Sequence, residues 1–268
     1  MSTLGQYAGA VGATIKRDAA IFLSYRMRLF SQVLGMLFTV TTFYYVAKLV
    51  RPSAVGPQGR YFAFVVIGIV ATAVLTSALN SAQIIRAELM AGNFERVLIS
   101  PLGPVWGVVA VAAFPILYAT IFSGAMLGLA ALLFGIPVAA GGILPALAVA
   151  VVGALAMGCI GMLFVAGLLA FKSAMGATWV VAGLSLLGGA YFPVRLFPSW
   201  LRWTTNVQPF TPTLDLLRHA LLGTPTRHPV LAEVAALVGF TAVLMPLCIG
   251  ALALAIWLSR RRGTIMEY

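Results

Sequence analysis

Few residues of this sequence are able to do chemistry, and most of them stand at the ends of long apolar runs. Asp215 and His219 are spaced to share one face of a helix. Such a pair suits either a metal or acid–base site or a surface ion pair, and the ion pair is the simpler alternative. The chain has no glycine-rich phosphate loop ending in Lys-Ser or Lys-Thr. We therefore predict no catalytic residue, no metal and no cofactor in this chain.

The acidic residues bear on the energy source that a membrane protein of this sequence would use. The six are Asp18, Glu88, Glu95, Asp215, Glu233 and Glu267. All stand at segment ends or in connections, and none is near the middle of an apolar run. Proton- and ion-coupled transporters place ionisable groups halfway across the membrane. A transporter powered by its own ion site is therefore disfavoured.

The composition indicates that lipid is the natural solvent of the elements that carry these residues. Hydrophobic residues make up 62% of the 268-residue chain and charged residues 9%, whereas a soluble domain has about 25% charged residues. A membrane-spanning helix needs about 20 mainly apolar residues. We predict an all-α integral membrane protein, one transmembrane domain over residues 1–268 with six spans. The predicted spans are at about 29–50, 61–83, 105–134, 143–171, 174–192 and 231–258.

The net charge of +11 is placed at the ends of the spans. Arg26 and Arg28 precede the first span, and 260–262 is a run of three arginines after the last. Basic residues concentrate on the cytoplasmic side of a membrane, so we predict that both termini are cytoplasmic. No basic face with interleaved aromatic residues occurs, which argues against nucleic acid as a partner. An imperfect apolar stripe predicts an interfacial helix within residues 1–28.

A charged segment over residues 84–104 separates the second and third predicted spans. Gly92 is expected to end one helix and Asn93 to cap the next, which runs from Phe94 to about Ile99 and stops before Pro101. This short helix suits docking into another protein, although an amphipathic helix resting on lipid headgroups fits the same pattern. The predicted contact residues are Glu88, Asn93, Phe94, Glu95, Arg96, Val97 and Leu98.

Residues 193–230 form a long segment that is too apolar for a free loop and too rich in proline to span. Thr211 and Pro212 are a cap and first-turn pair for a helix reaching Leu222, with Gly223 closing it. Irregular backbone at membrane depth is tolerated only where protein or a water-filled cavity covers it. We therefore predict an outer re-entrant gate in preference to a passive loop. Its candidate residues are Phe197, Trp200, Trp203, Pro209, Phe210 and Arg218.

Together these two segments resemble the type-2 family of ATP-binding-cassette export permeases, which includes drug, polysaccharide and lipid exporters. The matching elements are Ser100-Pro101-Leu102 before the third span, and Trp200-Leu201, Asn206-Val207-Gln208-Pro209 and Arg218 before the sixth. The resemblance implies a connecting helix at the N-terminus, a coupling helix at 94–99 and outer re-entrant helices over 195–222. The run Ala91-Gly92-Asn93 departs from the Gly-Thr found in many members, which leaves the register of the coupling helix open.

The resemblance also implies partners. Two permease subunits, identical or different, lie in the bacterial inner membrane. They work with two cytoplasmic ATP-binding subunits, which bind ATP and Mg. We predict export of an amphipathic, lipid-linked or hydrophobic drug-like molecule, powered by the separate ATPase. The alternatives are an ion-coupled secondary transporter and a membrane assembly or immunity factor that transports nothing.

Overall fold

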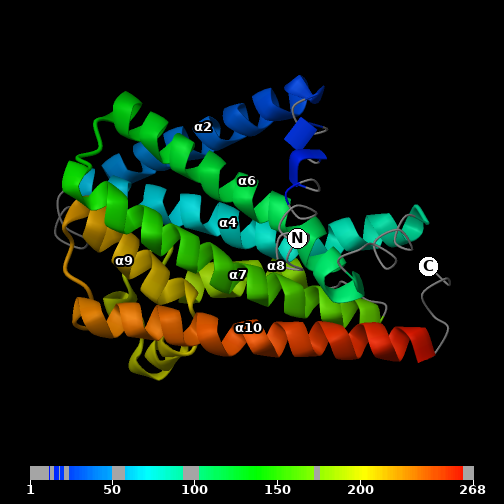
Figure 1. The fold of residues 1–268 in the computed structure, drawn as a ribbon. Helices are drawn as coiled ribbons and strands as arrows, with labels where there is room; N and C mark the ends of the chain where they lie inside the picture. Colours follow the sequence, from blue (N-terminus) through cyan, green and yellow to red (C-terminus); the bar gives the residue numbers. More distant parts are fainter. Residues whose placement is uncertain are drawn as a thin grey trace.

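The computed structural model describes residues 12, 15–17, 19, 20, 24–49, 58–92, 103–171 and 176–261, and every regular element among them is helical. Figure 1 shows long helices running side by side in one bundle. The α-helices whose bounds the structure describes are α2 Arg26–Leu49, α4 Gln58–Met90, α6 Gly103–Phe134, α7 Ile143–Phe171, α8 Ala177–Leu187, α9 Phe210–Leu222 and α10 Val230–Arg261. Among the described residues, 3-10 helices also occur: η1 Ala140–Gly142, η2 Val194–Leu196 and η3 Ser199–Asn206.

Five of these helices are long and apolar enough to cross a membrane. They correspond to α2, α4, α6, α7 and α10, so the predicted all-α multi-pass architecture is confirmed. The fifth predicted span, 174–192, is different. It contains α8, which has 11 residues and is therefore only about 16 Å long, against a hydrocarbon core of about 30 Å. Six spans stay a prediction.

The chain nevertheless passes from one end of the bundle to the other between α7 and α10. Ala177 of α8 packs in a core cluster with Leu75 of α4. The helix then ends at Gly188, and Gly189 takes a left-handed conformation with φ of 81°, which glycine adopts without steric cost. The Tyr61 hydroxyl at the start of α4 donates to the Tyr191 carbonyl (3.4 Å). This passage is therefore a short helix followed by irregular backbone.

We call the end of the bundle that carries α9, η3 and the starts of α4 and α10 the α9 end. The opposite end carries the last turns of α4, α7 and α10 and is called the Arg261 end (Figure 1). One buried cluster at the Arg261 end joins Leu89 of α4 to Leu169 of α7 and Ile256 of α10. The Ser259 hydroxyl also donates to the Leu169 carbonyl (2.7 Å). The bundle is therefore packed along its whole length.

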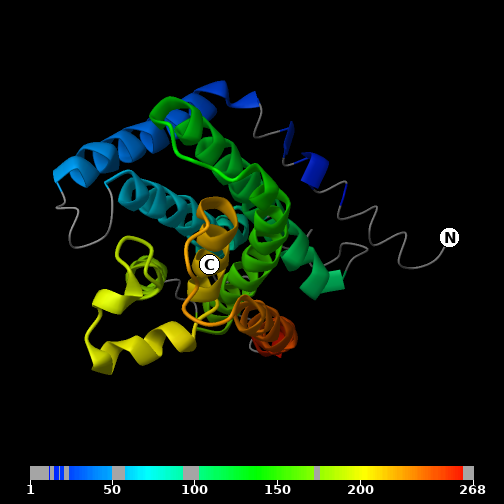
Figure 2. The same cartoon turned by 90° about the vertical axis from the view of Figure 1, so that its left-hand side faces the viewer.

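Small residues on α7 bring the central helices close together. A Cβ atom at Gly161 would overlap the carbonyl oxygen of Ala78 on α4. Small residues allow this close approach, which is a main source of helix association in membranes. Among the five spans α4 is the most buried and α2 the least. α2 lies at the edge of the bundle, against α4 and α6 (Figure 2).

Two predicted segments lie mostly or partly outside the described residues. The interfacial helix over 1–28 is described only at a few positions, and residues 93–102 are not described. The predicted helix end at Gly92 is confirmed, because α4 stops at Met90 and Gly92 has a left-handed φ of 68°. The first candidate span, Leu29–Leu49, agrees with the predicted 29–50, and α2 itself begins one turn earlier, at Arg26.

Gly161→Ala is expected to destabilise the bundle by about 1–3 kcal/mol, because the added methyl group meets backbone that cannot move aside. Gly167→Ala on the same helix is the matched control, since a Cβ there meets no atom within 4 Å. The control should be neutral or stabilising by up to about 1 kcal/mol. Thermal unfolding in detergent micelles measures both, and equal midpoints for the two variants would contradict the packing.

Candidate functional site

Arg218 of α9 is the most constrained residue of the predicted gate. It is 3% exposed. Its guanidinium donates to the carbonyls of Gly189 (2.9 Å), Ala190 (2.9 Å) and Phe64 (3.1 and 3.3 Å). The same group lies 3.3 Å from the centroid of the Phe64 ring. A planar guanidinium suits this arrangement because it offers several donors and stacks on an aromatic face.

The partners of Arg218 follow from the broken passage after α8. The chain does not continue as a helix beyond Gly188, so the carbonyls of Gly189 and Ala190 lack the amide donors that a continuing helix would supply. Each buried carbonyl left unsatisfied costs about 1–3 kcal/mol. Burial lowers the pKa of the Arg218 guanidinium to about 9, and the Asp215 carboxylate opposes that shift. At neutral pH the group therefore stays protonated and cationic.

The junction between α8 and α9 is closely packed as well as hydrogen-bonded. A Cβ at Gly188 would lie 2.6 Å from the Phe210 ring, and a Cβ at Gly68 would overlap the Ala190 carbonyl oxygen. In the amide orientation that pairs nitrogen with a carbonyl, Gln208 donates to Leu184 (3.3 Å) and accepts from the Gly188 amide (3.0 Å). The start of α9 is therefore fixed to the end of α8.

A second arginine joins three elements at the α9 end. Arg227 donates to the Asp215 carboxylate of α9 (2.7 Å) and to the Thr205 hydroxyl of η3 (2.6 Å). Its guanidinium also lies 3.9 Å from the Glu233 carboxylate of α10. Glu233 is 2% exposed, and its Oε1 atom accepts no hydrogen bond from the described residues. One cation thus lies close to two carboxylates, one in the middle of α9 and one in the first turn of α10.

The structure gives Asp215 and His219 separate partners. Asp215 pairs with Arg227, and the His219 Nδ1 atom lies 2.9 Å from the Thr224 carbonyl oxygen. No group of three or more His, Cys, Asp or Glu residues able to hold a metal occurs in the described part of the chain. Asp215 therefore takes part in an ion pair, although its partner is a residue 12 positions away that the helical spacing does not indicate.

The predicted gate residues form two groups in space. Pro209, Phe210 and Arg218 are buried between α8, α4 and α9, whereas Trp200 and Trp203 of η3 are 71% and 62% exposed. Phe197 is half-buried, and its carbonyl accepts a hydrogen bond from the exposed Arg202 (2.9 Å). The first group holds the irregular backbone, and the second presents aromatic rings at the rim, where membrane interfaces favour tryptophan.

The helix predicted in this segment is confirmed at its end and shifted at its beginning. Gly223 closes α9 in a left-handed conformation with φ of 62°. The helix begins at Phe210, two residues before the predicted first-turn Pro212, so Thr211 is not the cap. The reason is that the Pro209 carbonyl accepts hydrogen bonds from both the amide (3.3 Å) and the hydroxyl (2.8 Å) of Thr213.

Of the predicted ATPase contacts, only Glu88 lies within the described residues. It is half-buried in the last turn of α4, at the Arg261 end. Asn93, Phe94, Glu95, Arg96, Val97 and Leu98 lie outside the described residues. Sequence reasoning did not single out Arg227 or Thr205, and it named Gln208 only as a member of the Asn206-Val207-Gln208-Pro209 element. Nothing in the local sequence indicates the contacts of these residues, because their partners come from other elements.

Arg218→Met is expected to destabilise the protein by about 3 kcal/mol or more, because it leaves buried carbonyls without donors. Arg218→Lys should cause a smaller loss of stability than Arg218→Met, since an ammonium keeps the charge and some donors but lacks the planar guanidinium geometry. Arg195→Met, at an exposed site of the same segment, is the control and should change stability by less than about 0.5 kcal/mol. Thermal unfolding compares the three, and similar losses for Arg218→Met and Arg195→Met would refute this role.

Arg227→Met is expected to cost about 1–3 kcal/mol, because two nearby carboxylates lose their shared cation. Adding Glu233→Gln removes one of the two negative charges and should restore part of the loss. The measurement is again thermal unfolding, of both single variants and the double variant. Strictly additive losses would show that Arg227 and Glu233 do not interact.

The comparison with known proteins covers most of this architecture. The sequence model of the ABC-2 type transporter family matches residues 11–222, which ends with the last residue of α9. No curated protein matches the chain. The family comprises the permease components of ABC transporters, which associate with an ATP-binding subunit. With a match over well more than half of its length, the chain belongs to the ABC-2 type transporter family.

Proposed function

We propose that this chain is the permease subunit of an exporter, driven by a separate ATPase subunit, that moves an amphipathic, lipid-linked or hydrophobic drug-like molecule out of the cell. The observation that carries the proposal is where the charges lie in the described spans. α6 and α7 contain no Asp, Glu, Lys or Arg, and in α4 and α10 such residues stand only in the end turns. An ion-coupled transporter needs an ionisable group near mid-depth.

The polar side chains inside the bundle support the same conclusion. The Ser77 hydroxyl of α4 donates to the Pro115 carbonyl (2.9 Å) on α6, and the Ser123 hydroxyl of α6 donates to the Val70 carbonyl (3.1 Å) on α4. Pro115 has no amide hydrogen, so α6 lacks one helical hydrogen bond near this point. These hydroxyls join helices and do not titrate. Energy for transport would then have to come from outside the chain.

The lengths of α4 and α10 favour a contact with a partner at the Arg261 end. They have 33 and 32 residues, so they are about 50 and 48 Å long and exceed the hydrocarbon thickness of about 30 Å. Charged residues gather in their last two turns: Arg86, Glu88, Arg260 and Arg261. In the proposal this end is cytoplasmic, and the predicted helix at 94–99 docks into the ATPase there.

The remaining parts of the proposal concern assembly and gating. Two permease subunits assemble with two ATPase subunits, which bind ATP and Mg, in the bacterial inner membrane with both termini in the cytoplasm. The outer re-entrant segment, residues 193–230, acts as the gate at the opposite face. The hydrogen bonds of Arg218 and Arg227 support gating. Such discrete contacts can be broken and re-formed as a segment moves between two positions.

Phe94→Asp tests the ATPase contact. A charge on the docking helix should reduce the amount of co-purified ATPase by about tenfold or more, as removal of a central interface residue does. Substrate-stimulated ATP hydrolysis in reconstituted vesicles should fall with it. Val207→Asp, at an exposed position of the α9 end (62%), is the matched control and should leave assembly unchanged.

Three results would contradict the proposal, each in a different way. Unchanged assembly for Phe94→Asp would remove the docking helix from the ATPase contact. Transport by the chain alone, abolished by a protonophore while ATP is maintained, would establish an ion-coupled transporter. Vesicles that move no cargo with an ATPase bound would favour an assembly or immunity factor.

A further inference from the structure

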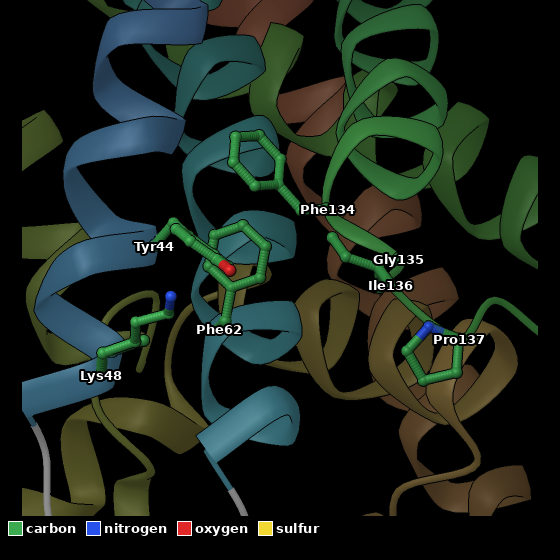
Figure 3. Close-up of a pocket in the computed structure, with 8 residues that line it drawn as sticks. Tyr44, Lys48, Phe62, Phe134, Gly135, Ile136 and Pro137 are labelled. Atoms are coloured by element: carbon green, nitrogen blue, oxygen red, sulfur yellow. The ribbon is translucent and has the colours of Figure 1, made fainter.

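A small pocket opens at the α9 end between α2, α4 and the turn after α6. Its volume is about 220 Å³, which is less than the roughly 300–1,000 Å³ of sites that hold a whole drug-sized molecule. Figure 3 shows residues of its lining. The eight lining residues are Tyr44, Ala47, Lys48, Phe62, Phe134, Gly135, Ile136 and Pro137. None of the residues placed in the gate or in the ATPase contact is among them.

Three aromatic rings from three helices make a rigid wall for this pocket. The Tyr44 ring centroid lies 5.3 Å from that of Phe62 and 4.9 Å from that of Phe134. The Phe62 and Phe134 centroids are 5.4 Å apart in an edge-on arrangement. Such distances are those of favourable aromatic pairs. The wall therefore keeps its shape without a ligand and presents both apolar ring faces and polarised ring edges.

One cation stands at the edge of this wall. The Lys48 ammonium lies 4.5 Å from the centroid of the Tyr44 ring and 5.8 Å from that of Tyr45. The residue is exposed, so a ligand can reach it. Figure 3 shows Lys48 and Tyr44 extending from neighbouring turns of α2 on the side that faces α4. No lining residue is acidic, so the pocket combines a positive charge and a phenol hydroxyl with apolar walls.

The position of the pocket at the end of a membrane-spanning helix indicates which ligand it binds. Lys48 is the last residue but one of α2, so the ammonium stands where a membrane-spanning helix leaves the hydrocarbon and meets the headgroups. The abundant anion at that depth is the phosphate of a phospholipid, and lysine binds phosphate as a point charge. The geometry points to a specific phospholipid site, in which Lys48 and Tyr44 bind the headgroup phosphate and the aromatic wall packs against the glycerol and first acyl carbons.

Headgroups occur at both membrane faces, so this inference does not depend on which face the α9 end occupies. It also does not depend on export, because the lipid binds to the permease by itself and need not be the cargo. Lipid binding to the permease requires no ATPase, so its absence would leave the proposed function unchanged.

The test measures lipid binding to the delipidated full-length protein by native mass spectrometry. Phosphatidylglycerol is the probe, and diacylglycerol with the same acyl chains is the matched lipid without phosphate. We expect one saturable phosphatidylglycerol site at least about tenfold tighter than for diacylglycerol, with Lys48→Gln losing that preference. Lys48→Arg should keep it, and Tyr44→Phe should weaken it by a smaller factor. Arg195→Gln, an exposed charge at the same end, should change nothing.

Each other outcome overturns the site. Equal binding of the two lipids by the wild type would reduce the pocket to an apolar crevice. An unchanged preference in Lys48→Gln would place the lipid elsewhere, provided that the variant elutes and melts like the wild type. Displacement of the lipid by millimolar inorganic phosphate would make this a site for free phosphate.

Discussion

Backbone carbonyls that no longer belong to a helix need hydrogen-bond donors when they lie inside an apolar bundle, and this need organises the α9 end of the protein. Lipid supplies no donors, so protein must. The Arg218 guanidinium donates hydrogen bonds to the Gly189 and Ala190 carbonyls. It also donates to the Phe64 carbonyl on α4, the most buried of the five spans. The close approach of Gly68 to Ala190 follows, because the irregular chain must lie against α4 for one side chain to reach all three carbonyls.

The same contacts define which parts can move together. Gln208 bonds the start of α9 to the end of α8, and Arg218 bonds the middle of α9 to residues 189 and 190. Arg227 connects Asp215 of α9 with η3 and α10. α8, the irregular passage and α9 therefore form one connected unit. A displacement of that unit from α4 would break the bonds from Arg218 to Phe64 and from Tyr61 to Tyr191 but would leave those to Gly189 and Ala190 intact. Displacing the whole unit would therefore cost fewer hydrogen bonds than displacing α9 alone.

Charge is distributed so that the two ends of the bundle differ in kind. At the Arg261 end the charged residues stand in the last turns of long helices, and Arg261 lies 4.0 Å from the ring of Trp257. At the α9 end Arg218 and Glu233 are buried and Arg227 and Asp215 are half-buried, and both arginines make specific bonds to neighbouring elements. The first pattern suits contact with water, headgroups or a protein partner. The second suits a joint between elements, because buried charges need fixed partners.

The sequence by itself determined the lipid solvent, the bounds of four spans to within a few residues, the end of α9 at Gly223 and the resemblance to type-2 ABC permeases. These follow from local signals: apolar runs, prolines, and glycines at helix ends. It did not reveal that 174–192 forms a helix of only 11 residues, because apolar composition does not show where a helix stops. Only the tertiary structure decided the partners of Arg218 and Arg227. Arg218 and Phe64 are 154 residues apart, and such a contact depends on which helices lie side by side, a property that no local pattern contains.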